Sequence, residues 1–320
     1  MANQVNVRFS AGEKSENPAA TDLKVLAGRA RTSPSYRWWV LLDEDAAVLP
    51  AGEDGFRAAA WGDDPGRWPL PAATDPLDRW HRAVALGGQG RYSAACAELD
   101  EAERTLVVEA GLRSLMASTR ASWFRQMGAH VRAARYDGAA IALVGLATTR
   151  VGPFITHARC DALTGLAADA LGVGRFSAAD ALLTRCEELV MRQGRQGSLW
   201  RQQLRLRWVR AELAMVSGDG AGAVRHALDA RELATETDSL RHITKTELIV
   251  AAAVSSLGDI ERSRHIAHSV LDACSEHGLV PLRWAAAMLT TGLGDAPASP
   301  SIIAECAALL HQRGGVLADG

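Results

Sequence analysis

The chain has 320 residues, of which 48% are hydrophobic and 22% are charged, and its formal net charge is -2 at pH 7. This is the composition of a soluble folded protein, and nothing in the overall charge indicates nucleic acid or an anionic membrane as a partner. No stretch reaches the roughly 20 apolar residues of a membrane-spanning helix, and the polar N-terminus lacks the apolar segment of a signal peptide. The five cysteines are an odd number and widely scattered, which argues against a disulfide framework. We therefore expect a cytoplasmic protein.

The N-terminal region differs from the rest of the chain. Residues 1–20 are polar and are predicted to form a disordered tail. Residues 21–76 contain Trp38, Trp39, Trp61 and Trp68, together with many prolines and acidic side chains. One interpretation is a cap that covers the exposed core of the first repeat. The other is an acidic, Trp-bearing strap that folds back into the groove of the array. Neither leaves room for a separate DNA-binding domain, because no helix-turn-helix pattern occurs here.

A turn signal recurs along residues 77–312. We place the six turns at Gly90, Ala134, Gly174, Gly218, Gly258 and Gly294. The successive spacings are 44, 40, 44, 40 and 36 residues. An arginine or an aspartate follows each turn, and in three units an aromatic residue comes next: Tyr92, Tyr136 and Phe176.

Small side chains flank these turns at fixed distances. Five positions after the turns stand Ala95, Ala139, Ala179, Ala223, Ser263 and Ser299. Seven positions before them stand Ala83, Ala167, Ala211, Ala251 and Ala287, with Met127 as the exception. A glycine ends a helix at low cost, and small residues let two helices approach closely, with the aromatic residue filling the wedge between them. Loop signals lie about midway between turns, at 109–114, 151–153, 193–198, 236–239 and 277–281, so each unit is predicted to be an antiparallel helix pair.

This pattern resembles the tetratricopeptide repeat, most closely in the units turning at Gly90 and Gly174. The period of about 40 residues exceeds the 34 residues of that family, and resembles the sensor arrays of bacterial transcription regulators and peptide-sensing regulators. The resemblance implies an all-α, right-handed superhelical solenoid of six antiparallel helix pairs over residues 77–312. Residues 21–76 would be a small Trp/Pro-rich N-terminal cap, and residues 313–320 a C-terminal tail. The alternative is a non-repetitive helical bundle with glycines placed by chance.

The resemblance also implies which side chains line the concave groove. In the family these lie 13, 10, 6 and 3 residues before the turn. This register points to Ala121, Phe124, Asp161, Thr164, Arg205, Trp208, Glu212, Lys245 and Leu248. One helical turn earlier, position 17 before the turn holds His157, Arg201 and Arg241. Residues four apart share a helix face, so Arg201–Arg205 and Arg241–Lys245 form two neighbouring cationic ladders. The predicted partner-binding residues are His157, Arg201, Arg205, Trp208, Arg241 and Lys245.

A cationic groove with an aromatic floor suits an acidic peptide segment or a C-terminal carboxylate. The sequence therefore favours a protein–protein interaction module: an adaptor, a chaperone-like scaffold or a sensor. Alternatively, these arginines form a solvated face beside Glu187, Glu188 and Glu212. Residues 192–210 mix arginine with tryptophan, which favours a second alternative, a regulatory sensor for a small ligand or nucleic acid. A self-assembling homo-oligomeric subunit is a third.

Chemical motifs point away from catalysis. His265, His268, Cys274 and His277 have the residue types of a zinc site. On one continuous helix, however, the first two histidines lie about 60° apart and the other pair points to the far side. We therefore expect surface histidines and a core cysteine, with no metal. No Walker loop, nucleophile elbow or acid–base couple is recognisable, so we expect neither enzymatic activity nor a cofactor.

Overall fold

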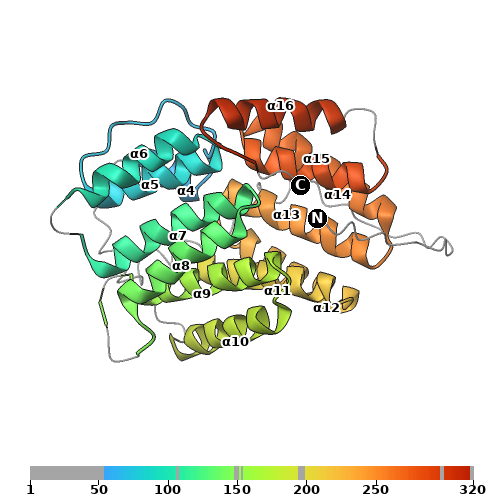
Figure 1. Cartoon of the computed structure of the whole chain (residues 1–320). Helices are drawn as coiled ribbons and strands as arrows, with labels where there is room; N and C mark the ends of the chain where they lie inside the picture. The colour runs from blue at the N-terminus through green and yellow to red at the C-terminus, as the bar shows by residue number, and fades with distance from the viewer. Residues whose placement is uncertain are drawn as a thin grey trace.

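The computed structural model of the chain describes residues 54–105, 108–147, 151–152, 154–193, 199–295 and 299–317. Over these residues the chain is built of thirteen α-helices and contains no strand (Figure 1). The predicted fold class, an all-α solenoid of packed helix pairs, is confirmed. Within the same part of the chain, no helix is both long and apolar enough to cross a membrane. The predictions for residues 1–20 and for Trp38 and Trp39 lie outside the described residues.

A short helix, α4 (Asp54–Trp61), precedes six helix pairs. The first helices of the pairs are α5 (Pro76–Gly88), α7 (Ala110–Gln126), α9 (Ile155–Gly172), α11 (Trp200–Val216), α13 (Leu240–Ser256) and α15 (Val280–Gly292). The second helices are α6 (Tyr92–Glu103), α8 (His130–Val144), α10 (Phe176–Gln193), α12 (Gly220–Thr235), α14 (Ile260–Glu276) and α16 (Ser299–Gln312). The first helices also contact one another from pair to pair, so they line the inner face of the array.

Five of the six predicted turns are where the sequence pattern placed them. Gly90, Gly174, Gly218, Gly258 and Gly294 have φ between 73° and 86°. At Gly174 the amide of the glycine donates to the carbonyl of Leu171, and the next amide, of Arg175, donates to Ala170. This pair of bonds is the Schellman motif, which satisfies carbonyls at the end of α9 and requires the left-handed conformation that glycine adopts without strain.

The second turn was predicted wrongly. Ala134 lies inside α8, and the chain turns at Gly128, whose φ is 81°. In the corrected register the small residues fall into place, because Ala121 lies seven positions before the turn and Ala133 lies five positions after it. Both are completely buried, whereas Ala139 is exposed. The physical requirement for small side chains at the helix crossing is thus met in the second unit as in the others.

Two local expectations also change. Of the aromatic residues expected to fill the wedge after the turn, Tyr92 is buried, but Phe176 is 42% exposed. Tyr136 lies within α8 and stacks on Phe124 of α7, with ring centres 5.2 Å apart. The predicted loop at residues 109–114 is instead the first turn of α7, which begins at Ala110.

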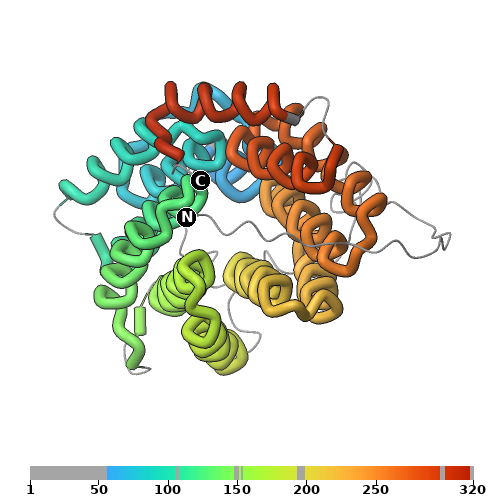
Figure 2. The backbone as a smooth tube through the Cα atoms, turned by 45° about the vertical axis from the view of Figure 1, so that its right-hand side comes forward, coloured from blue at the N-terminus to red at the C-terminus, as the bar shows by residue number. Residues whose placement is uncertain are grey.

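The last pair returns to the first, so the array closes on itself (Figure 2). Leu310 of α16 belongs to the same hydrophobic core as Tyr92 of α6. After α16, Arg313 donates a hydrogen bond of 2.7 Å to the carbonyl of Gln89 and accepts one of 3.0 Å from the amide of Ser93. These contacts tie the C-terminal end to the turn of the first pair, which fixes the curvature of the inner face.

The Schellman turns provide a test of the repeat register. Gly174→Val is expected to lower the free energy of unfolding by at least about 1 kcal/mol, because a β-branched residue is strained at positive φ. Nothing lies within 4 Å of a Cβ added at Gly174 or at Gly138, so crowding plays no part at either position. Gly138 lies in the middle of α8, and Gly138→Ala should instead stabilise the protein. Urea unfolding of both variants measures the contrast, and equal stabilities would contradict it.

Candidate partner-binding site on the inner face

The predicted cations of α11 converge on one buried carboxylate. Arg201 and Arg205 lie one helical turn apart, and both form ion pairs with Asp161 of α9, at 2.8 Å for Arg201. The carboxylate is almost completely buried. Burial by itself raises the pKa of Asp161, but the two guanidiniums outweigh it and hold this pKa below its usual value. The two arginines are therefore fixed in position and are not part of a freely solvated row.

Arg241 of α13 lies beside these arginines but forms no ion pair with any described carboxylate. Its guanidinium donates to the carbonyl of Ala60 at 3.0 Å and to that of Val84 at 3.3 Å. Burial, together with repulsion from Arg201 and Arg205, lowers the pKa of Arg241 to about 10. The site therefore contains a cation that is contacted by backbone carbonyls and the Trp61 ring, and by no carboxylate of the described residues.

Trp208 and Lys245 form the part of the site nearest the middle of α11 and α13. The Trp208 indole is buried and donates a hydrogen bond of 3.0 Å to the hydroxyl of Thr246. The Lys245 ammonium lies 4.6 Å from the centre of the Trp208 ring, a cation–π contact. Burial lowers the pKa of Lys245 to about 8, and the nearby carboxylate of Glu212 offsets only part of this shift. Burial likewise raises the pKa of Glu212.

An aromatic cluster forms the wall between α4 and the inner helices. Trp61 lies 5.6 Å from Trp80 and 5.9 Å from His242, measured between ring centres. His242 in turn stacks on Trp208 at 5.7 Å. Burial, together with neighbouring arginines, lowers the pKa of His81 to about 4 and that of His242 well below its usual value. Both histidines are therefore neutral at pH 7.

His157, the remaining predicted residue, lies on α9 one helical turn before Asp161 and is half-buried. Its charge contributes to the lowered pKa of Asp161. The six predicted site residues thus lie on three consecutive inner helices. Five of them, together with Asp161, form a contiguous network, and His157 lies at its edge.

A second buried network lies on α7, α8 and α9, and sequence reasoning missed it. Arg125 forms ion pairs with both Asp137 and Asp169, the latter at 3.0 Å. Asp137 is completely buried, and burial raises its pKa to about 6. Gly165 makes room for this carboxylate, since a Cβ there would lie 2.1 Å from an oxygen of Asp137. Arg125 stands three residues before Gly128, a groove position that the misplaced second turn concealed.

These networks share a pattern, in which a cation of one inner helix faces an acid on a neighbouring helix. The balance is uneven around α11 and α13. There the cations are Arg201, Arg205, Arg241 and Lys245, and the acids beside them are Asp161, which pairs with Arg201 and Arg205, and Glu212, which lies near Lys245. The inner face therefore has more positive than negative charge at this place, beside an aromatic wall.

The described arginines of residues 192–193 and 199–210 do not form a phosphate-binding row. Arg210 bonds to Asp180, Thr184 and Glu187 on α10, and Arg207 approaches Glu187 and Asp229. Glu187, which the sequence predicted to neighbour the inner-face arginines, therefore lies on the outer helix α10 and pairs with Arg210. The described arginines of this segment therefore form no row of unpaired guanidiniums on the inner face.

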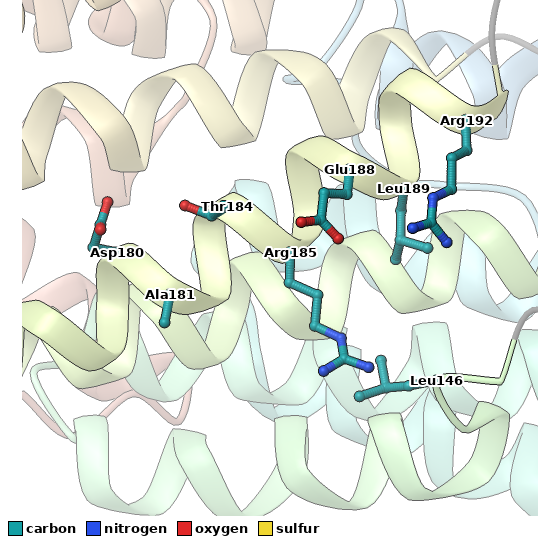
Figure 3. Close-up of a pocket in the computed structure, with 8 residues that line it drawn as sticks. All are labelled: Leu146, Asp180, Ala181, Thr184, Arg185, Glu188, Leu189 and Arg192. Carbon is teal, nitrogen blue, oxygen red and sulfur yellow. The ribbon is translucent and has the colours of Figure 1, made fainter.

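An outer groove of about 540 Å³ runs along α10 (Figure 3). Figure 3 shows Arg185, Glu188 and Arg192 projecting from α10 into this space, with Leu146 facing them. All three charged side chains are solvent-exposed. The groove lies on the opposite side of the helix pair from the inner face. Its exposed arginines, Arg185 and Arg192, are therefore suitable control positions for substitutions of the inner-face cations.

The candidate zinc ligands are spread over α14 and its end. His268 contacts the carboxylate of Asp295, and Cys274 is 1% exposed within the core. His277 caps the C-terminus of α14. Among the residues that the structure describes, no group of three or more histidine, cysteine or acidic side chains could hold a metal ion.

No known protein family matches the chain, and no curated protein matches it. Among solved structures, the chain is similar to the crystal structure of a Rap protein complexed with Competence and Sporulation Factor. The TM-score is 0.51 and the sequence identity 12%, over 92% of this chain and 78% of that chain. The likeness extends along the whole array and supports the helical-repeat fold inferred from the sequence.

The Arg125 network provides a test of buried charge balance. Arg125→Met is expected to lower the free energy of unfolding by about 3 kcal/mol, because it leaves Asp137 and Asp169 buried without their cation. The matched control is Arg104→Met, which removes an exposed partner of Glu101 and should cost less than about 0.5 kcal/mol. Chemical denaturation measures both values, and similar costs would contradict this account.

The buried histidines predict how stability depends on pH. The pKa of His81 is about 4 in the folded chain and about 6.5 when unfolded, so the unfolded state binds more protons between these values. Stability should fall as the pH drops through this window, by up to about 1.4 kcal/mol per pH unit for this group. His81→Gln cannot titrate and should flatten the curve. Thermal unfolding from pH 7 to pH 5 tests this, and parallel curves for the two proteins would count against a neutral, buried His81.

Proposed function

We propose that this protein is an interaction module, an adaptor or sensor, that binds an acidic segment of another protein on its inner face. The observation that carries the proposal is Arg241, which lies beside Arg201 and Arg205 and has, among the described residues, two carbonyl oxygens and the Trp61 ring as partners but no carboxylate. A carboxylate placed here would relieve repulsion among the cations and form charge-assisted hydrogen bonds. The role is binding rather than catalysis.

The arrangement favours a carboxylate ligand because the arginines are pre-organised. Asp161 holds Arg201 and Arg205 by some of their donors, and each guanidinium has five, so further N–H groups remain for a ligand. Side chains that are already fixed lose little conformational entropy on binding. Trp208 lies beside these charges, under the ammonium of Lys245, and tryptophan and arginine are the residues that most often dominate binding energy at interfaces.

The solved neighbour gives this proposal its second support. The Rap protein, which shares the fold of this chain, was solved as a complex with Competence and Sporulation Factor. A helical array of the same arrangement can therefore carry a recognition function. The acidic character of the ligand proposed here rests on the charges of this chain alone.

A binding measurement with matched variants tests the proposal. The probe is a fluorescein-labelled hexaglutamate peptide with a free C-terminal carboxylate, followed by fluorescence anisotropy. Arg205→Gln combined with Lys245→Gln should weaken binding about tenfold or more, because two charge-assisted contacts are lost. Arg201 stays paired with Asp161 in this variant, so the fold is kept. The control, Arg185→Gln combined with Arg192→Gln, removes the same charge from the outer groove and should bind normally.

The pH dependence adds a second readout. The pKa of Lys245 is about 8, so the wild type should lose affinity for the peptide as the pH rises through 8 and the ammonium loses its proton. Lys245→Gln should show no such step. Equal losses in the inner and outer double variants would mean that the peptide responds to overall charge, and would contradict the site.

A further inference from the structure

The inner-face site already holds a segment of the chain itself. Helix α4 ends at Trp61, and its ring lies between two cations, with the guanidinium carbons of Arg201 and Arg241 at 4.8 Å and 5.5 Å from the ring centre. The carbonyl of Ala60 accepts the hydrogen bond from Arg241, and the carbonyl of Gly62 accepts one of 3.1 Å from the amide of Leu240. Helix α4 therefore contacts α13 directly, although about 180 residues separate them.

These contacts have the chemistry of a bound ligand. The last four carbonyls of a helix lack partners within the helix, and that end carries partial negative charge. Ala60 is among the last residues of α4, so Arg241 binds the negative end of this helix. An aromatic side chain stacked against guanidinium groups completes the arrangement. The end of α4 thus places a negative carbonyl oxygen and an aromatic ring against Arg241 and Arg201. These are cations that we propose bind the partner.

The segment after α4 crosses from the inner face to the first helix pair. The side-chain amide of Gln89 donates to the carbonyls of Pro65 and Arg67, at 2.9 Å and 3.0 Å. The Arg91 guanidinium lies 3.7 Å from the centre of the Trp68 ring. This anchor is separate from the contacts of Trp61. Phe56 and Ala59 bury α4 against α5, so a partner displaces only the end of α4 from α13, while the rest of the helix and residues 65–68 stay attached.

We propose that the end of α4 occupies the inner-face site as a built-in ligand, and that a partner segment displaces it. The partner segment would carry carboxylates next to an aromatic side chain. This inference rests on the proposed function, because it concerns the same site.

The relative strengths of the contacts make such an exchange feasible. Arg241 makes hydrogen bonds to neutral carbonyls, and a carboxylate accepts a bond about twice as strong. Trp61 is only half-buried, so part of its side chain is accessible to solvent. A covalently linked segment competes at a high effective concentration, however, so a partner has to bind through several groups at once. Weakening the hold of α4 should therefore strengthen partner binding.

The test uses Trp61→Ala in the full chain, with the labelled hexaglutamate peptide and a second labelled peptide of six glutamates followed by a C-terminal tryptophan. Trp61→Ala should bind both peptides about three- to tenfold more tightly than the wild type, because it removes the cation–π contacts that hold α4. The Trp-bearing peptide should gain more, since it can take the place of the Trp61 ring. Trp68→Ala is the matched control, and its affinity should be unchanged. If Trp61→Ala folds poorly, Trp61→Leu keeps an apolar side chain at this position, loses the cation–π contact and should show the same gain in affinity.

Hydrogen exchange gives an independent readout. Peptide binding to the wild type should speed exchange at the amide of Leu240, which is bonded to Gly62 while α4 is in place. Unchanged or weaker peptide binding by Trp61→Ala, in a protein whose affinity still depends on Arg205 and Lys245, would overturn the displacement and leave the proposed function standing. Absence of peptide binding in every variant would overturn both.

Discussion

The structure depends on one constraint, which is that charges brought to the inner face must be balanced between neighbouring helices. An unpaired buried charge costs several kcal/mol, so an acid on one inner helix has to meet a cation on the next. Asp161 meets this requirement with two arginines from α11, and Arg125 meets it for two acids on α8 and α9. These pairs fix how each helix pair sits against the next, because a different rotation would separate them. Where the balance fails, around Arg241, the chain supplies carbonyl oxygens from α4 and α5.

Closure of the array explains why this inner face is so well shielded. The C-terminal segment holds the turn of the first pair, and α4 reaches across to α13 (Figure 2). An open solenoid would expose the same arginines to water, where their charges would be screened and their pKa values ordinary. In the closed form burial lowers the pKa values of Arg241 and Lys245, and repulsion from neighbouring arginines lowers them further. The same geometry therefore produces both the cation excess and the place for an internal ligand.

The sequence was sufficient for features that repeat, and insufficient for contacts that do not. Gly90, Gly174, Gly218, Gly258 and Gly294 were found because each turn needs a positive φ and small neighbours at fixed distances. Gly128 meets the same requirements with Ala121 and Ala133, but the Arg–Tyr pair after Ala134 imitates the signal of the first unit. The small-residue rule could have corrected this, because Met127 broke that rule only in the wrong register.

Several site features were beyond reach of such reasoning. Helical spacing predicted that four cations lie near one another: Arg201, Arg205, Arg241 and Lys245. It could not predict the ion pairs of Asp161 with Arg201 and Arg205, because these depend on the rotation of α9 against α11. The position of Trp61 depends on closure of the whole ring, which no local pattern encodes. Trp208 is buried by packing between two units, where it also donates a hydrogen bond to Thr246, and helical spacing does not predict that contact.

The most direct test of the account is to locate a bound acidic peptide on the protein. A hexaglutamate peptide bearing a benzophenone group can be photo-crosslinked to the full chain and the attachment points read by mass spectrometry. The account predicts crosslinks to α11 and α13, lost on addition of excess unlabelled peptide. Crosslinks concentrated on α10 and the outer groove, with none on α11 or α13, would contradict it.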